Sequence, residues 1–67
     1  MYKSNIKIER EDLTELHFGC INVTCIDGAI IYREPDADNP KDYTARFASL
    51  NDNTIKQIEI TFYRDEK

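Results

Sequence analysis

The stretch INVTCIDGAIIYRE, residues 21–34, decides the fold, because two apolar-rich runs flank the pair Asp27-Gly28. Both central residues of a type I′ hairpin turn need a positive φ, and an Asp-Gly pair meets this need at little steric cost. A two-residue turn at this point fixes the register of an antiparallel hairpin. The predicted pairs are Ile26 with Ala29, Cys25 with Ile30, Val23 with Tyr32 and Ile21 with Glu34.

Opposite residues of such a hairpin lie on the same face of the sheet. One face of the predicted hairpin is therefore apolar and includes Cys25, which we expect to pack in the core as a small hydrophobic residue. Cys20 has no defined place in this pattern. In an extended strand the two cysteines lie on opposite faces about 16 Å apart, so we expect no disulfide between them.

The sequence also predicts where the elements on either side of this hairpin begin and end. Residues 2–10 alternate between apolar and polar side chains, which predicts a half-buried strand. Pro35 cannot donate to a strand ladder, so it ends the second strand of the hairpin, and a polar loop follows at residues 35–42. Residues 10–17 fit either a turn or about two turns of helix.

Apolar faces within residues 43–47 and 58–62 predict a second hairpin. Its register places these faces opposite each other across a loop at residues 51–54. The predicted pairs are Phe47 with Ile58, Ala45 with Ile60 and Tyr43 with Phe62, and on the other face Arg46 with Glu59 and Thr44 with Thr61. A charge pair and a Thr–Thr pair are both favoured cross-strand partners, which supports the register independently.

Together these elements predict a mainly β fold. We expect a small antiparallel β meander, barrel or sandwich of about five strands, with a short helix near residues 10–17 as the one open alternative. The length is enough for one domain, residues 1–67. A chain this short buries only about 60% of its unfolded surface, so a partner chain would add to its stability.

Charge and hydropathy narrow the classes of function. Thirteen acidic against nine basic residues give a net charge of −4. This charge argues against binding to a phosphate backbone or an anionic membrane and suits a protein partner with a basic surface. Because no apolar run approaches the length of a membrane span or a signal peptide, we expect a cytoplasmic protein.

The chain offers residue types for metal binding or catalysis, but in the wrong pattern. His17, Cys20 and Cys25 lack the paired cysteine spacing of a zinc site. The acidic loop that begins at Asp36 resembles the start of a calcium loop, but it has Lys41 where glycine is required. His17 is the sole candidate base for a nucleophile. We therefore expect no metal, no other cofactor and no enzymatic activity.

Acidic residues gather in groups along the chain, and the first group surrounds two leucines, Leu13 and Leu16. An apolar patch rimmed by charges is typical of a docking site. The predicted partner-binding residues are Glu9, Glu11, Asp12, Leu13, Glu15, Asp36 and Asp38. The prediction is a non-catalytic protein-binding module that acts by occlusion through an acidic surface. Its narrowest form is a phage or mobile-element inhibitor of a host nucleic-acid-binding or defence protein.

Two other functions stay open. A small β-barrel can bind single-stranded nucleic acid by stacking bases on aromatic side chains beside cations, and here the candidates are Tyr32, Arg33, Tyr63 and Arg64. The chain could instead be a homo-oligomeric structural protein that associates through an exposed edge strand. A homodimer is compatible with each of these functions.

Overall fold

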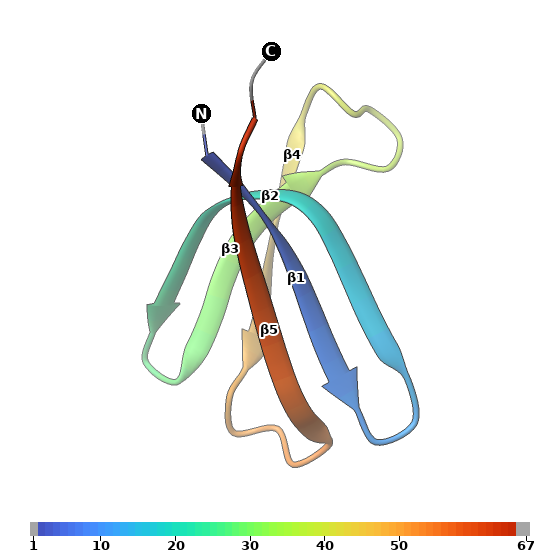
Figure 1. Ribbon diagram of the computed structural model, residues 1–67, viewed down its shortest axis with the longest axis vertical. Coiled ribbons are helices and arrows are strands. Elements are labelled where there is room, and N and C mark those ends of the chain that lie inside the picture. The colour runs from blue at the N-terminus through green and yellow to red at the C-terminus, as the bar shows by residue number, and fades with distance from the viewer. Residues whose placement is uncertain (1, 66–67) are drawn as a thin grey trace.

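The computed structural model describes residues 2–65 and consists of antiparallel β-strands (Figure 1). The strands are β1 (Tyr2–Arg10), β2 (Thr14–Ile26), β3 (Ala29–Pro35), β4 (Tyr43–Ser49) and β5 (Ile55–Arg64). They form one sheet in the order β4-β3-β2-β1-β5. The mainly β prediction with about five strands is confirmed. Residues 11–13 form a turn and β2 begins directly after it, so the segment left open between helix and turn contains no helix.

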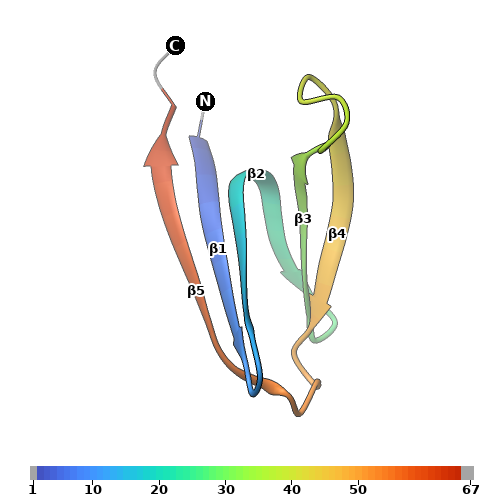
Figure 2. The same ribbon diagram turned by 90° about the vertical axis from the view of Figure 1, so that its right-hand side faces the viewer.

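The sheet does not lie flat, because β2 bends sharply in its middle. Gly19 and Asn22 have φ values of 70° and 57°. The pairing of β2 shifts register near both residues, once against β1 and once against β3. Such irregularities bend a strand and increase its twist. Figure 2 shows the result: β5, β1 and the first half of β2 form one layer, and the second half of β2 with β3 and β4 forms the other.

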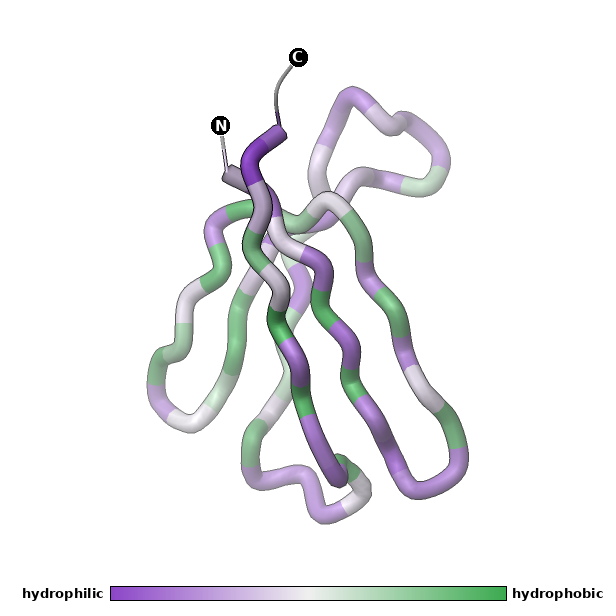
Figure 3. The backbone as a smooth tube through the Cα atoms, viewed as in Figure 1, coloured by the Kyte–Doolittle hydropathy of each residue, from purple (hydrophilic) through white to green (hydrophobic). Residues whose placement is uncertain are grey.

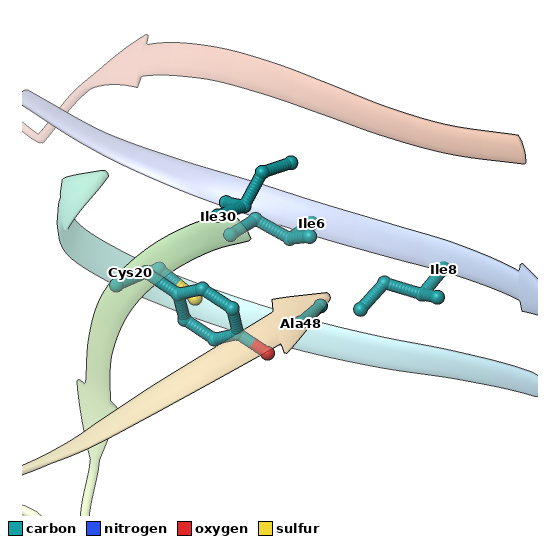
Figure 4. Close-up of a cluster of buried hydrophobic side chains, with 6 residues drawn as sticks. Ile6, Ile8, Cys20, Ile30 and Ala48 are labelled. Carbon is teal, nitrogen blue, oxygen red and sulfur yellow. The ribbon is translucent and has the colours of Figure 1, made fainter. Parts of the chain in front are cut away.

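A small core lies between these two layers (Figure 4). Its buried members are Ile6, Ile8, Cys20, Ile30, Tyr32 and Ala48, with Val23, Ile55, Ile58 and Ile60 partly buried around them. Figure 3 shows the alternation of hydrophobic and hydrophilic residues along β1 and β5 that supplies one side of this core. Only a few large side chains are buried, as expected for a domain of this size.

The predicted hairpin around Asp27-Gly28 is formed by β2 and β3. Ile26 pairs with Ala29 and Cys25 with Ile30, as the turn chemistry predicts. Beyond Thr24 the register shifts, and Ile21 lies opposite Arg33. The predicted pairing of Ile21 with Glu34 is therefore wrong, because the bulge at Asn22 adds a residue to β2.

Cys25 was expected to pack in the core, whereas Cys20 had no defined place in the predicted pattern. Cys20 is fully buried in the core, whereas Cys25 is exposed. Cys25 pairs with Ile30 and therefore lies on the inner face, as predicted, but the β2–β3 hairpin diverges there from β1 and β5 and leaves it uncovered (Figure 1). Both cysteines are free thiols.

The predicted hairpin between β4 and β5 is wrong. Strand β4 pairs with β3 and β5 pairs with β1, at opposite edges of the sheet. Phe47 and Phe62, which were expected in the core, are 72% and 64% exposed. The physical reason is that the inner face of β1 offers β5 an equally apolar match, with Ile6 opposite Ile60 and Ile8 opposite Ile58.

Candidate protein-binding surface

The turn between β1 and β2 presents an apolar side chain among acids. Glu11, Asp12 and Leu13 are all exposed. The backbone N–H of Arg10 donates to the carbonyl of Leu13 at 2.8 Å and closes the turn, and the N–H of Glu11 donates to the carbonyl of Thr54 at 2.9 Å. The second bond holds the turn against the β4–β5 connection at one end of the molecule (Figures 1 and 2).

The first half of β2 continues this surface, because its apolar side chains are exposed and its polar side chains face inward. Leu16 lies opposite Lys7 on the outer face, and Phe18, two residues further along β2, lies on the same face. Leu13, Leu16 and Phe18 are 52%, 56% and 62% exposed, and together we call them the apolar stripe. The acids next to the stripe are Glu9, Glu11 and Asp12.

The side chains between these exposed apolar residues point inward instead. Glu15 and His17 lie opposite Ile8 and Ile6, so they share the inner face with the core isoleucines. Glu15 was predicted to contact a partner. The structure places it between the two layers, where its carboxylate accepts a bond from the Arg10 guanidinium at 2.5 Å.

An ion-pair network crosses the interior from β1 to β4. From Glu15 it passes to Nε2 of His17 at 3.2 Å, and Nδ1 of the same ring lies 2.6 Å from Glu34. The other carboxylate oxygen of Glu34 accepts from Arg46 at 2.8 Å. Both ring nitrogens of His17 therefore face carboxylates, which leaves neither for a substrate or a metal.

Hydrogen bonds lower the pKa of two carboxylates that contact Arg10, Glu15 and Asp52. The bond from Arg10 lowers the pKa of Glu15 below its ordinary value, with a smaller contribution from His17. Hydrogen bonds from the backbone N–H and hydroxyl of Thr54, followed by the bond from Arg10, lower the pKa of Asp52 to about 2. Because Arg10 also bonds Asp52 at 2.7 Å, the network connects the β1–β2 turn to the β4–β5 connection and stabilises the fold.

An aromatic side chain packs against the centre of this network. The rings of His17 and Tyr32 lie 5.4 Å apart at an interplanar angle of 57°. Burial raises the pKa of Tyr32 to about 12. The tyrosine therefore belongs to the core, together with the histidine beside it.

The second predicted acidic group lies in the β3–β4 loop, at the opposite end of the molecule from the β1–β2 turn (Figures 1 and 2). The Asp36 carboxylate accepts bonds from the backbone N–H of Asp38 at 2.8 Å and of Asn39 at 3.3 Å, and from the Thr44 hydroxyl at 3.1 Å. These bonds, first among them the one from Asp38, lower the pKa of Asp36. Asp36 thus stabilises its own loop, while Asp38 is exposed.

The seven predicted partner-binding residues consequently do not form one surface. Glu9, Glu11, Asp12 and Leu13 gather at and beside the β1–β2 turn. Glu15 faces the interior, and the two loop aspartates lie at the far end. The sequence contained the signal for Glu15: the alternation of residues 14–18 in a strand places it on the other face from Leu16 and Phe18.

Sequence reasoning missed a second exposed apolar area, on the outer faces of β3 and β4. Ile31 lies opposite Phe47 there, and both are exposed. Ile26 and Ala29 pair at the same end of the β2–β3 hairpin. The signal was the doublet Ile30-Ile31, because two consecutive isoleucines place one apolar side chain on each face of a strand.

The residues considered for nucleic-acid stacking are distributed over the molecule. Tyr32 is 2% exposed and offers no face to a base. Arg33 lies on the outer face of β3, whereas Tyr63 lies opposite Lys3 in the other layer.

Within residues 2–65 the structure contains no pocket, no cluster of three or more His, Cys, Asp or Glu residues placed to hold a metal ion, and no helix that could cross a membrane. Comparisons with protein-family models, with curated proteins and with solved structures find no match to this chain.

Proposed function

We propose that the protein is a non-catalytic binding module and that its contact surface is the β1–β2 turn with the apolar stripe. The observation that carries the proposal is the exposure of Leu13, Leu16 and Phe18 beside a group of acids. The partner we propose is a protein with an apolar contact area surrounded by basic side chains.

Exposed apolar groups and acids contribute in different ways to such a contact. Full burial of an exposed leucine or phenylalanine side chain contributes roughly 1.5–3 kcal/mol. Because the three side chains of the stripe are already about half buried, each would contribute about half of that to a complex. The acids Glu11 and Asp12 would steer a basic partner during encounter and select against acidic ones. This combination of an apolar centre and a charged rim is typical of protein interfaces.

The narrowest form of the proposal is an inhibitor that occludes a nucleic-acid-binding or defence protein. A net charge of −4 supports this form, because acidic side chains compete with phosphates for the same lysines and arginines. The turn projects from one end of the molecule, which suits insertion into a basic groove (Figure 1).

The test compares charge reversal at the two ends of the molecule. The variant Glu11→Lys/Asp12→Lys changes the proposed surface, and Asp38→Lys is the matched control in the β3–β4 loop. Tagged proteins are used to capture partners from a lysate treated with nuclease, and the captured protein is then titrated by calorimetry. We expect at least a tenfold loss of affinity for the first variant, about 1.4 kcal/mol, and little change for the control.

A second variant tests the apolar stripe directly. Leu16→Ser/Phe18→Ser removes two exposed side chains and is expected to abolish capture while the circular dichroism spectrum is retained. Equal capture by wild type and both variants would refute the proposed surface. Capture of nucleic acid alone, lost on nuclease treatment, would replace the proposal with single-strand binding.

A further inference from the structure

Each of the two edge strands of the sheet has one side of its backbone without a partner strand among the described residues. Strand β4 pairs only with β3, and β5 pairs only with β1. Proteins usually protect such edges with proline, bulges or several charges, because unpaired backbone groups recruit other strands. Neither edge strand contains proline, and the one register shift of the β1–β5 pair lies at Glu9–Arg10, away from residues 58–62. Charged residues of β5 lie mostly near its ends, at Lys56 and Arg64, so residues 43–47 and 58–62 contain one charged side chain each, Arg46 and Glu59.

These two edges match each other in sequence. When β4 and β5 are aligned antiparallel with Phe47 opposite Ile58, the apolar side chains of both strands coincide. The aligned pairs are Phe47 with Ile58, Ala45 with Ile60, Tyr43 with Phe62, Arg46 with Glu59 and Thr44 with Thr61. Within one chain this match is unused, because the two strands lie at opposite edges of the sheet.

We propose that β4 of one copy pairs with β5 of a second copy in this register. The match would then be satisfied between chains, and the sheet would continue from one copy into the next. In a pair of copies, β5 of the first and β4 of the second would stay unpaired and could each bind a further copy. The contact is therefore heterologous and leads to a closed ring or a filament. This inference does not depend on the function proposed for the β1–β2 turn.

The faces of the two strands determine how the copies would join. Phe47 is on the outer face of β4, opposite Ile31, whereas Ile58 and Ile60 are on the inner face of β5, opposite Ile8 and Ile6. Pairing in the proposed register therefore joins the inner face of one copy to the outer face of the next. The second copy curls in the opposite sense, so its layers extend away from those of the first.

Exposure and core size both favour a second copy as the occupant. Phe47 and Phe62 are among the most exposed apolar side chains of the described residues, at 72% and 64%, and each would gain an apolar neighbour across the new ladder. A chain of this length buries about 60% of its unfolded surface, so added burial at the edges compensates for its small core.

The decisive experiment blocks one edge strand at a time and then mixes the two variants. Ala45→Lys/Phe47→Lys alters only the β4 edge, and Phe62→Lys alters only the β5 edge; all three positions are exposed. The control is Phe18→Lys, an exposed aromatic outside both edges. Sedimentation velocity over a concentration series up to the millimolar range is expected to show association for wild type and the control and monomers for each edge variant. A mixture of the two edge variants should form a one-to-one dimer through the remaining intact pair of edges.

Cysteine cross-linking tests the register. In a Cys25→Ser background, Thr44→Cys/Thr61→Cys should give a ladder of intermolecular disulfides on a non-reducing gel. Thr44→Cys/Gln57→Cys is the control, because a shift of four residues separates the thiol-bearing residues by about 13 Å. A monomeric wild type at millimolar concentration would overturn the proposal. So would association that survives both edge variants, or edge variants that fail to combine although wild type associates.

Discussion

Replacing Glu34 by glutamine should destabilise the protein more than any other single change of an acidic residue to its amide. Among residues 2–65, Glu34 is the one carboxylate that joins β2 to β4, with one oxygen at His17 and the other at Arg46. The side chains of Glu34 and His17 are 17% and 15% exposed, and that of Arg46 is 53% exposed. The two bonds therefore differ in their contributions.

The magnitude follows from this difference. The half-buried bond to His17 involves a charged acceptor and contributes about 1.5–3 kcal/mol. The exposed bond to Arg46 contributes only about 0–1 kcal/mol, because solvent screens it. We expect Glu34→Gln to lower the free energy of unfolding by roughly 2–3 kcal/mol, a large part of the total for a domain this small. For 60–100 residues each kcal/mol changes Tm by about 4–8 °C, so Tm should fall by roughly 8–24 °C.

The assay is urea denaturation followed by circular dichroism, at one fixed protein concentration and neutral pH. Glu59→Gln is the control, because Glu59 is exposed and its carboxylate accepts a bond from the side-chain amide of Gln57 on the same strand, β5. Arg46→Ala separates the smaller of the two contributions. If the free energy of unfolding of Glu34→Gln is within about 0.5 kcal/mol of wild type, the range of ordinary surface substitutions, the bond to His17 does not contribute as stated.

Three further predictions concern the core, the acid limb of stability and the thiols. Ile6→Val should cost about 0.5–1.5 kcal/mol in a denaturation experiment, whereas Ile31→Val, on the exposed outer face, should cost less than about 0.5 kcal/mol; equal losses would contradict the assignment of the two faces. The pKa of Asp52 is lowered to about 2, so its contribution to stability is present above its ordinary value near 3.8 and is lost as the pH falls through about 2; Asp52→Asn should flatten the acid limb of a Tm–pH profile, and an unchanged limb would contradict the bonds drawn to that carboxylate. Cys25 should react with a thiol reagent in the folded protein, while Cys20, which is buried and has a pKa raised to about 11, should react only on unfolding; the two rates are resolved by mass spectrometry, and comparable rates would argue against the buried position of Cys20.

The sequence predicts the fold best where the determinants are local. The Asp27-Gly28 turn fixes two pairs of the β2–β3 hairpin without reference to the rest of the chain. The bulge beyond it could not be predicted in the same way, because Asn22 adopts a positive φ inside a run of residues that otherwise reads as a regular strand. One inserted residue then places Ile21 on the outer face, opposite Arg33, and Cys20 in the core, the reverse of a regular strand.

Strand pairing over longer distances could not be predicted from complementarity alone. Residues 58–62 present the same apolar face to any partner strand with alternating apolar residues. Both β1 and β4 qualify, and loop closure does not decide between them, since the cost grows only slowly with loop length. Strand β1 is selected because Ile6 and Ile8 can then be covered from both sides, which a β4–β5 hairpin would not achieve.

The polarity of β2 connects the structural findings to the proposed binding role. In its first half Glu15 and His17 occupy the inner face, while Leu16 and Phe18 occupy the outer face. An isolated domain would be more stable with the two sets exchanged, because burying leucine and phenylalanine contributes more than a half-buried ion-pair network of the same size. By this argument the observed arrangement costs stability in the single chain, and that cost would be recovered if the partner we propose covered the outer face. The bonds from Arg10 to Glu15 and Asp52 hold the β1–β2 turn against the β4–β5 connection, which would reduce the entropy lost if the turn binds the partner we propose.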